Sequence, residues 1–135
     1  MFLQTDARWK DLPIAHTTVG KEGCLLVSLC NANLLLGNLV FPDQLAKQLA
    51  AVDGFDEEGK LLWKMLQKTN SILWMNMASM EEAIDAMEII EYERPNNASH
   101  FVFVYKGQEI DPKPGTERGR IVSTRRLALI PHGEE

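Results

Sequence analysis

The sequence predicts an α+β fold, with helices in the N-terminal part and an antiparallel sheet in the C-terminal part. Apolar residues recur at helical spacing between residues 24 and 68. From residue 88 the chain instead contains short runs of β-branched and aromatic residues, separated by Pro, Gly and Asn. The length of 135 residues, 45% of them hydrophobic, suits a single domain, 1–135, with one core.

Glycines and prolines divide the N-terminal part into an arm and three helices. Residues 1–23 show no sustained periodicity, which predicts an irregular arm. Residues 24–36 are apolar almost all round, as expected of a buried central helix that ends before Gly37. Helical spacing predicts further helices over residues 42–52, where Pro42 begins the segment, and 58–68.

Strand-like composition dominates the rest of the chain. Segment 71–77 alternates loosely and is consistent with a strand. Ser79 followed by Glu82 has the form of a capping box, which predicts a short helix through Ala86. Four later runs have the composition of strands: EIIEYE, HFVFVY, QEI and RIVS. The central helix and its neighbours are therefore expected to pack on a C-terminal antiparallel sheet.

Charge and motif content exclude several classes of function. The net charge of −5 argues against nucleic-acid binding, which depends on Lys and Arg neutralising phosphates. The sequence contains neither a zinc-binding spacing of Cys and His nor a P-loop, so no metal and no cofactor are expected. One basic cluster is interpreted as a solvated face: Arg118, Arg120, Arg125 and Arg126.

No segment approaches the ~20 apolar residues that cross a bilayer, so no membrane insertion is expected. The first residues, MFLQTDARWK, lack a basic segment followed by an apolar core. A cytoplasmic location is the expectation, with a phage particle or another export route left open. The oligomeric state is not readable from these features.

Cys24 stands behind a glycine and opens the apolar helix, in the stretch GKEGCLLVS. In the first turn its sulfur would feel unpaired backbone N–H groups, which favour the thiolate that nucleophilic chemistry needs. Cys30 falls mid-helix and is interpreted as a small buried hydrophobe. Six residues of helix separate the two by about 9 Å of rise, which excludes a disulfide between them.

A thiol nucleophile needs a base, and His100 is the best placed of three histidines because it opens the clearest strand. His16 lies in the irregular arm and His132 near the C-terminus, where structural or solvent roles are expected. If Lys106 and Gly107 form a two-residue hairpin turn, residue i pairs with residue 213 − i. His100 and Asp111 then become diagonal neighbours on one face, although a one-residue change in the turn would separate them.

Four motifs occur in an order that resembles a known family: QTDARW, GC at a helix start with Ser28 four residues on, HFVFVY and IDP. They resemble the papain-like cysteine peptidases related to the bacteriocin-processing, double-glycine-leader peptidases. The resemblance implies a papain-like fold with Cys24 as nucleophile, His100 as base and Asp111 as the residue that orients His100. It also implies that Gln4 donates its amide to the oxyanion hole, and that Trp9 anchors the arm.

The resemblance implies a cysteine peptidase that hydrolyses peptide or isopeptide bonds of a peptide or protein substrate through an acyl-enzyme. Other thiol acyl chemistry, as in an amidase, a cell-wall peptide hydrolase or an acyltransferase, uses the same groups and stays open. A catalytically silent papain-like binding module of a phage or secretion assembly is a further alternative. Leu25 and Leu26 favour it mildly, because relatives often carry small or polar residues there; Ser99 also departs from the family's usual glycine.

Overall fold

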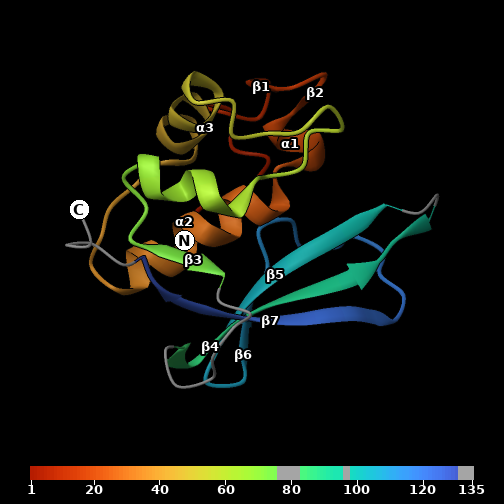
Figure 1. Ribbon diagram of the computed structural model, residues 1–135. Helices are drawn as coiled ribbons and strands as arrows, with labels where there is room; N and C mark the ends of the chain where they lie inside the picture. The colour runs from red at the N-terminus through yellow and green to blue at the C-terminus, as the bar shows by residue number, and fades with distance from the viewer. Residues whose placement is uncertain (76–82, 96–97, 131–135) are drawn as a thin grey trace.

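The computed structural model describes residues 1–75, 83–95 and 98–130, in which helices gather on one side of a five-stranded antiparallel sheet (Figure 1). The α+β class predicted from the sequence is confirmed. The helical elements are α1 (Val19–Glu22), α2 (Cys24–Leu35), α3 (Pro42–Ala51) and the 3-10 helix η1 (Trp63–Lys68). The strands are β1 (Pro13–Ile14), β2 (Thr17–Thr18), β3 (Leu73–Met75), β4 (Ala83–Glu93), β5 (Ser99–Tyr105), β6 (Gln108–Ile110) and β7 (Ile121–Leu129).

The N-terminal arm is more regular than its sequence predicts. It contains the short antiparallel pair β1 and β2, followed by the single turn α1. Such elements escape prediction because two to four residues are too few to show a period. The ring of Trp9 is buried, packs edge-on against Phe2 at 5.6 Å and donates from Nε1 to the carbonyl oxygen of Leu3. Trp9 therefore anchors the arm, as predicted.

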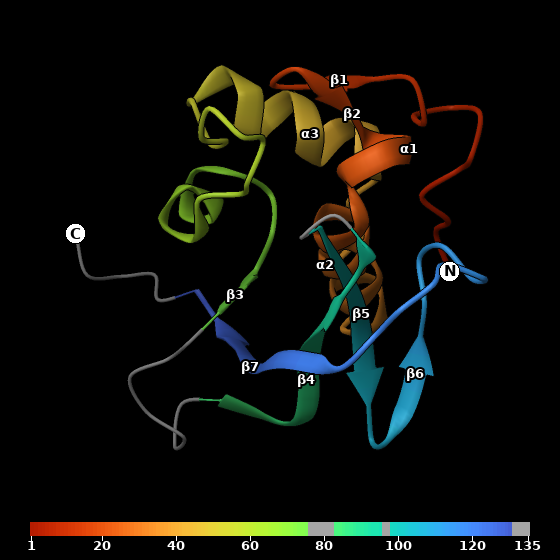
Figure 2. The same cartoon turned by 90° about the vertical axis from the view of Figure 1, so that its right-hand side faces the viewer.

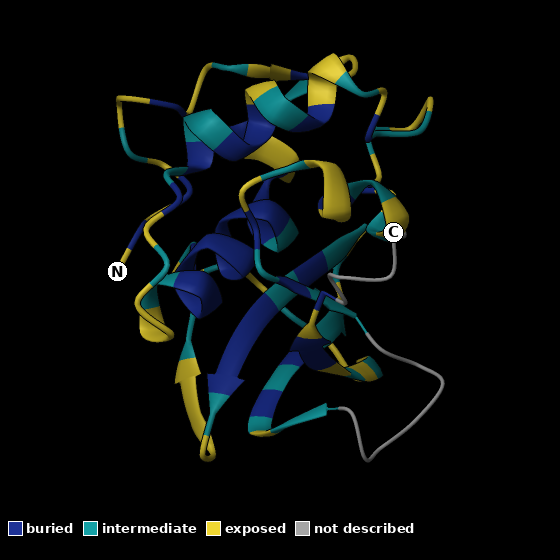
Figure 3. Cartoon of the chain, turned by 60° about the vertical axis from the view of Figure 1, so that its left-hand side comes forward, coloured by how far each residue is buried: buried dark blue, intermediate teal, exposed yellow. Residues whose placement is uncertain are grey.

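The two main helices are confirmed where the sequence predicts them. α2 is buried along most of its length, and Figure 3 shows it and β5 among the most buried parts of the molecule. Gly37, with φ of +81°, follows the last turn of α2 and provides the left-handed residue that commonly ends a helix. α3 begins at Pro42, and Asp53 with φ of 54° reverses the chain after its end.

The helix expected over residues 58–68 is wrong in its first part. Only Trp63–Lys68 is helical, as the 3-10 helix η1. Before it, Leu61 forms a β-bridge with Phe55, and Gly59 takes a φ of +85° inside the turn. Glycine adopts this left-handed conformation without steric cost, so the chain turns at Gly59 instead of continuing as a helix.

The large sheet has the strand order β3-β7-β4-β5-β6 (Figure 2). The four runs with strand composition fall in strands except for Arg120, which directly precedes β7, and residues 73–75 of segment 71–77 form β3. Residues 76 and 77 lie outside the described residues. The short helix expected through Ala86 is wrong over its described part, because residues 83–86 belong to β4, with Ala86 at a φ of 60° and a register shift toward β7. Residues 79–82, where that helix was expected to begin, lie outside the described residues.

The β5–β6 hairpin has the predicted register. Tyr105 pairs with Gln108 and Phe103 with Ile110, so each pair sums to 213 as expected. Lys106 and Gly107 both have positive φ, 52° and 77°, which is the conformation of a type I′ turn. The ladder ends at Ile110, so Asp111 lies just beyond β6 and not opposite residue 102 within a ladder.

One hydrophobic cluster joins α2 and α3 to the sheet, with Leu29, Leu45, Phe103 and Leu127 among its fully buried members. Cys30 lies in this cluster with no exposed surface, as predicted. Both cysteines are free thiols, in agreement with the predicted lack of a disulfide between them. Among the described residues, no helix is both long and apolar enough to cross a bilayer.

Candidate active site

Cys24 is the first residue of α2, and the glycine before it allows α1 to lead directly into that helix. The N–H group of Gly23 donates to the carbonyl oxygen of Val19 at 2.8 Å. A Cβ atom on residue 23 would lie 2.5 Å from the same oxygen, closer than real Cβ atoms approach. Residue 23 therefore has to be glycine for Cys24 to begin α2 in this position.

Cys24 and Ser28 lie one helical turn apart and face the edge of β5. The thiol of Cys24 donates to the carbonyl oxygen of Ser99 at 3.9 Å, and the hydroxyl of Ser28 donates to that of Phe101 at 3.4 Å. Four residues of helix and two of strand both span about 6–7 Å, so the spacings match. β6 pairs with β5 only over residues 103–105, which leaves this stretch of the edge to α2.

His100 and Asp111 form the pair that the hairpin register predicts. Nε2 of His100 lies 2.8 Å from Oδ1 of Asp111, and the two side chains are 2% and 12% exposed. His100 is held by its place in β5, where it pairs with Tyr92 of β4. Asp111 is held by the tight turn of the hairpin, so rigid backbone positions both members of the pair.

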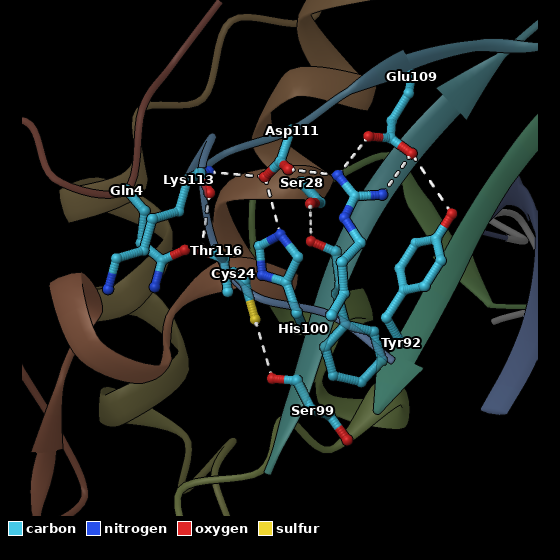
Figure 4. A network of polar contacts seen from close by, with 12 residues as sticks. Gln4, Cys24, Ser28, Tyr92, Ser99, His100, Glu109, Asp111, Lys113 and Thr116 are labelled. Carbon is cyan, nitrogen blue, oxygen red and sulfur yellow. Dashed lines mark hydrogen bonds and ion pairs between the residues drawn. The ribbon is translucent and has the colours of Figure 1, made fainter. Parts of the chain in front are cut away.

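The other partners of Asp111 determine which nitrogen of His100 carries the proton. Oδ1 also accepts the backbone N–H of Lys113 at 2.9 Å, and Oδ2 accepts from Arg118 at 2.7 Å. A carboxylate surrounded by donors is an acceptor toward the imidazole as well, so Nε2 carries the hydrogen. Nδ1 is then the basic nitrogen of the neutral ring. Figure 4 shows this ring between Asp111 and the thiol of Cys24.

The electrostatics of the resting site differ from those that a helix N-terminus predicts. Burial raises the pKa of the Cys24 thiol to about 11, although hydrogen bonds from the backbone of Phe101 and Leu25 act to lower it. Burial also lowers the pKa of His100 below its usual value, against the opposing effect of Asp111. The expected thiolate is therefore wrong for the resting state, because desolvation outweighs the helix terminus. At neutral pH the pair consists of a neutral thiol and a neutral imidazole.

Gln4 is buried, 1% exposed, and connects the arm to both sides of the site. The backbone N–H group of Gln4 donates to the carbonyl oxygen of Pro112 at 2.8 Å. Nearby, the side chain of Asn31 in α2 accepts from the backbone N–H of Phe2 and donates to its carbonyl oxygen. Nε2 of Gln4 donates one hydrogen to the carbonyl oxygen of Gly20 at 3.1 Å. Within the described parts of the chain, the second hydrogen of this amide has no acceptor. Oε1 is buried without a hydrogen-bond partner among the described residues.

A groove with a volume of about 460 Å³ opens beside Cys24. The two neighbours of His100, Ser99 and Phe101, line it together with Leu25 and Leu26. The leucines that follow Cys24, which depart from the family pattern, thus form part of its apolar wall. Charged residues also line the groove: Glu22, Asp56, Glu58, Lys60, Glu91 and Arg125.

Sequence reasoning missed the role of Arg118. The interpretation of the basic cluster as a solvated face is wrong for Arg118 and Arg125, which are 27% and 25% exposed and form ion pairs with Asp111 and Glu91 respectively. Arg120, at 82%, does lie on the surface. No local pattern distinguishes these arginines, because their partners are set by tertiary folding. Within the described parts of the chain, no group of three or more His, Cys, Asp and Glu side chains is arranged to hold a metal ion.

The four residues singled out in the sequence lie together at the junction of the arm, α2 and the β5–β6 hairpin (Figure 4). Hydrogen bonds connect them in series. The Cys24 thiol bonds to Ser99, which precedes His100, and His100 bonds to Asp111. The backbone of Gln4 bonds to Pro112, which follows Asp111. The chemistry of the site therefore has to be argued from this geometry. Comparisons of the chain with protein-family models, with curated proteins and with solved structures found no match.

Proposed function

We propose that the protein is a cysteine peptidase of papain-like fold that hydrolyses peptide or isopeptide bonds, with Cys24 as its nucleophile. One observation carries the proposal. A buried, carboxylate-bound histidine, with 2.8 Å between Nε2 of His100 and Oδ1 of Asp111, directly follows the residue whose carbonyl oxygen holds the thiol. The groove that opens at the same thiol provides room for a peptide.

In the proposed reaction, Nδ1 of His100 takes the thiol proton as the sulfur attacks the scissile carbonyl carbon. The thiol first turns from the carbonyl oxygen of Ser99 toward the imidazole. The oxygen of the tetrahedral intermediate accepts hydrogen bonds from the backbone N–H of Cys24 and from the second Nε2 hydrogen of Gln4.

The imidazolium next returns its proton to the leaving amine as the C–N bond breaks. A thioester remains on Cys24, and water hydrolyses it with His100 again acting as base. Asp111 holds the imidazole in one tautomer throughout and stabilises the imidazolium.

The proposal is tested by trapping the thioester. The protein is incubated with a peptide library, quenched in acid, and analysed by intact-mass and peptide mass spectrometry. Acyl groups are expected on Cys24 of the wild type and on no residue of Cys24→Ala. Adding an amine separates the chemistries, because a hydrolase releases a free acid whereas an acyltransferase produces an amide. Absence of both adduct and product across the library would contradict the proposal.

A second candidate, a catalytically silent binding module, is favoured by the burial of the thiol. Cys24 is 4% exposed and its hydrogen bond to Ser99 also caps the open edge of β5. A thiol with only this role should react with iodoacetamide at a rate that His100→Ala leaves unchanged. A rate that falls in His100→Ala at neutral pH would favour the enzyme.

A further inference from the structure

Arg118 lies behind the His100–Asp111 pair, in the connection between β6 and β7. Its Nη2 donates to Oδ2 of Asp111 at 2.7 Å, and its guanidinium also donates to both carboxylate oxygens of Glu109. The guanidinium carbon lies 4.5 Å from the ring centroid of Tyr92, whose hydroxyl donates to Glu109 at 3.4 Å. Arg118 is therefore held by Asp111, Glu109 and the ring of Tyr92.

We propose that Arg118 is a positioning residue for the reaction: it fixes the Asp111 carboxylate so that Oδ1 faces His100, and its charge restrains protonation of the imidazole. This inference rests on the proposed function and adds a fourth member to the Cys24, His100 and Asp111 series. Arg118 acts through Asp111 and is not itself placed to touch a substrate.

The positioning role follows from how the oxygens of Asp111 are occupied. Oδ1 accepts two hydrogen bonds, from His100 and from the N–H of Lys113, whereas the bond from Arg118 goes to Oδ2. A carboxylate held at one oxygen only can rotate about its Cβ–Cγ bond. The bond from Arg118 to the second oxygen opposes that rotation and so fixes the direction of the bond to His100. Guanidinium suits this task because its donors lie in a rigid plane.

The electrostatic role follows from the charges that surround His100. Asp111 acts to raise the pKa of His100, and Arg118 and Arg94 act to lower it, in addition to the larger effect of burial. The elements packed against β5 carry further titratable groups: the thiol of Cys24 on α2, Glu91, Tyr92 and Glu93 on β4, and Glu109 on β6. Removing the Arg118 charge while keeping Asp111 should therefore make the imidazole easier to protonate.

The test compares Arg118→Gln, which removes the charge, with Arg118→Lys, which keeps it without the planar fork. The exposed Arg120→Gln is the matched control. Side-chain NMR titration measures the pKa of His100 in the folded protein, with His100→Ala assigning the signal among the three histidines. Where a substrate is known, kcat and KM are measured across pH.

In Arg118→Gln we expect the pKa of His100 to rise and kcat to fall by about tenfold to a hundredfold with little change in KM, because a loosened base is misaligned. Arg118→Lys should lose kcat while leaving the pKa of His100 near its wild-type value. Arg120→Gln should match the wild type in both measurements.

An unshifted His100 titration together with a kcat within twofold of wild type in Arg118→Gln would overturn the inference. If that variant does not fold, Arg118→Lys decides: reduced kcat supports the inference, and wild-type kcat overturns it. If the wild type has no activity, the proposed function fails separately. In that case only the effect of Arg118 on the protonation of His100 is tested, by the NMR titration. An unshifted pKa of His100 in Arg118→Gln overturns that effect.

Discussion

Nε2 of His100 lies 2.8 Å from Oδ1 of Asp111, eleven residues further along the chain, because a two-residue turn brings them to the same face of the β5–β6 hairpin. The turn depends on positive φ at both Lys106 and Gly107. A one-residue change in the length of the turn would move Asp111 away from the imidazole. The turn begins six residues after His100, which is about 20 Å of extended strand at about 3.3 Å per residue. The position of the base relative to Asp111 is therefore determined by a turn at the far end of the hairpin.

Asp111→Asn tests the contribution of the carboxylate. We expect kcat to fall by about 10⁴, because an amide no longer enforces the Nε2–H tautomer or stabilises the imidazolium. Kinetics on the wild type and the variant measure the loss, and thermal unfolding checks that the fold persists. The exposed Asp11→Asn should leave both measurements unchanged. A loss below tenfold would show that Asp111 does not orient the base.

The two cysteines provide a matched pair of substitutions. Cys24→Ala should abolish turnover with little change in folding. Cys30→Ala should retain the chemistry but lower the free energy of unfolding by about 1 kcal/mol, because it opens a small void in a fully buried site. Urea unfolding and activity are measured on both variants. Turnover by Cys24→Ala would rule out the mechanism.

Gln4→Ala should lower kcat by about a hundredfold to a thousandfold, as expected for loss of one oxyanion donor. The substitution also removes the hydrogen bond to the carbonyl oxygen of Gly20, so unfolding is measured in parallel. Gln67→Ala, at an exposed position of η1, is the control. Equal rates for Gln4→Ala and the wild type would remove Gln4 from the site.

The raised pKa of Cys24 predicts the pH dependence of alkylation. The rate with iodoacetamide should climb by about tenfold per pH unit from pH 7 and level off only near pH 11, because the thiolate is the reactive form. In the denatured protein the same rate should level near pH 9. A plateau at neutral or acidic pH in the folded protein would instead reveal a preformed thiolate.

The same pKa shift has a consequence for stability. Between pH 9 and 11 the folded state keeps a proton on Cys24 that the unfolded state releases. The corresponding stabilisation is complete below pH 9 and is lost as the pH rises toward 11. Comparing the unfolding of the wild type and Cys24→Ala over this range isolates the contribution of Cys24, and parallel curves would contradict it.

Ser28→Ala should destabilise the junction between α2 and β5. The hydroxyl of Ser28 donates to the carbonyl oxygen of Phe101, and its removal leaves that acceptor unsatisfied at a cost of about 1–3 kcal/mol. Thr124→Ala, at an exposed position of β7, should change the free energy of unfolding by less than about 0.5 kcal/mol. Equal unfolding of the two variants would show that α2 does not depend on this bond to hold the strand edge.

Local patterns predicted those elements whose causes are local. The apolar run of α2, the proline that begins α3 and the turn at Lys106–Gly107 act over a few residues, and all three appear where expected. The helix predicted through Ala86 failed over residues 83–86, because a capping box is also a local signal. Pairing with β7, more than thirty residues further on, instead makes this segment a strand.

The candidate site divides in the same way. The sequence by itself determined the types of the site residues, the hairpin register that joins His100 to Asp111, and the start of α2 at Cys24. Only the tertiary structure decided that the thiol is buried and neutral, that Gln4 contacts both Gly20 and Pro112, and that Arg118 binds Asp111. Desolvation and long-range ion pairs depend on every segment that surrounds a group, so no stretch of sequence contains them.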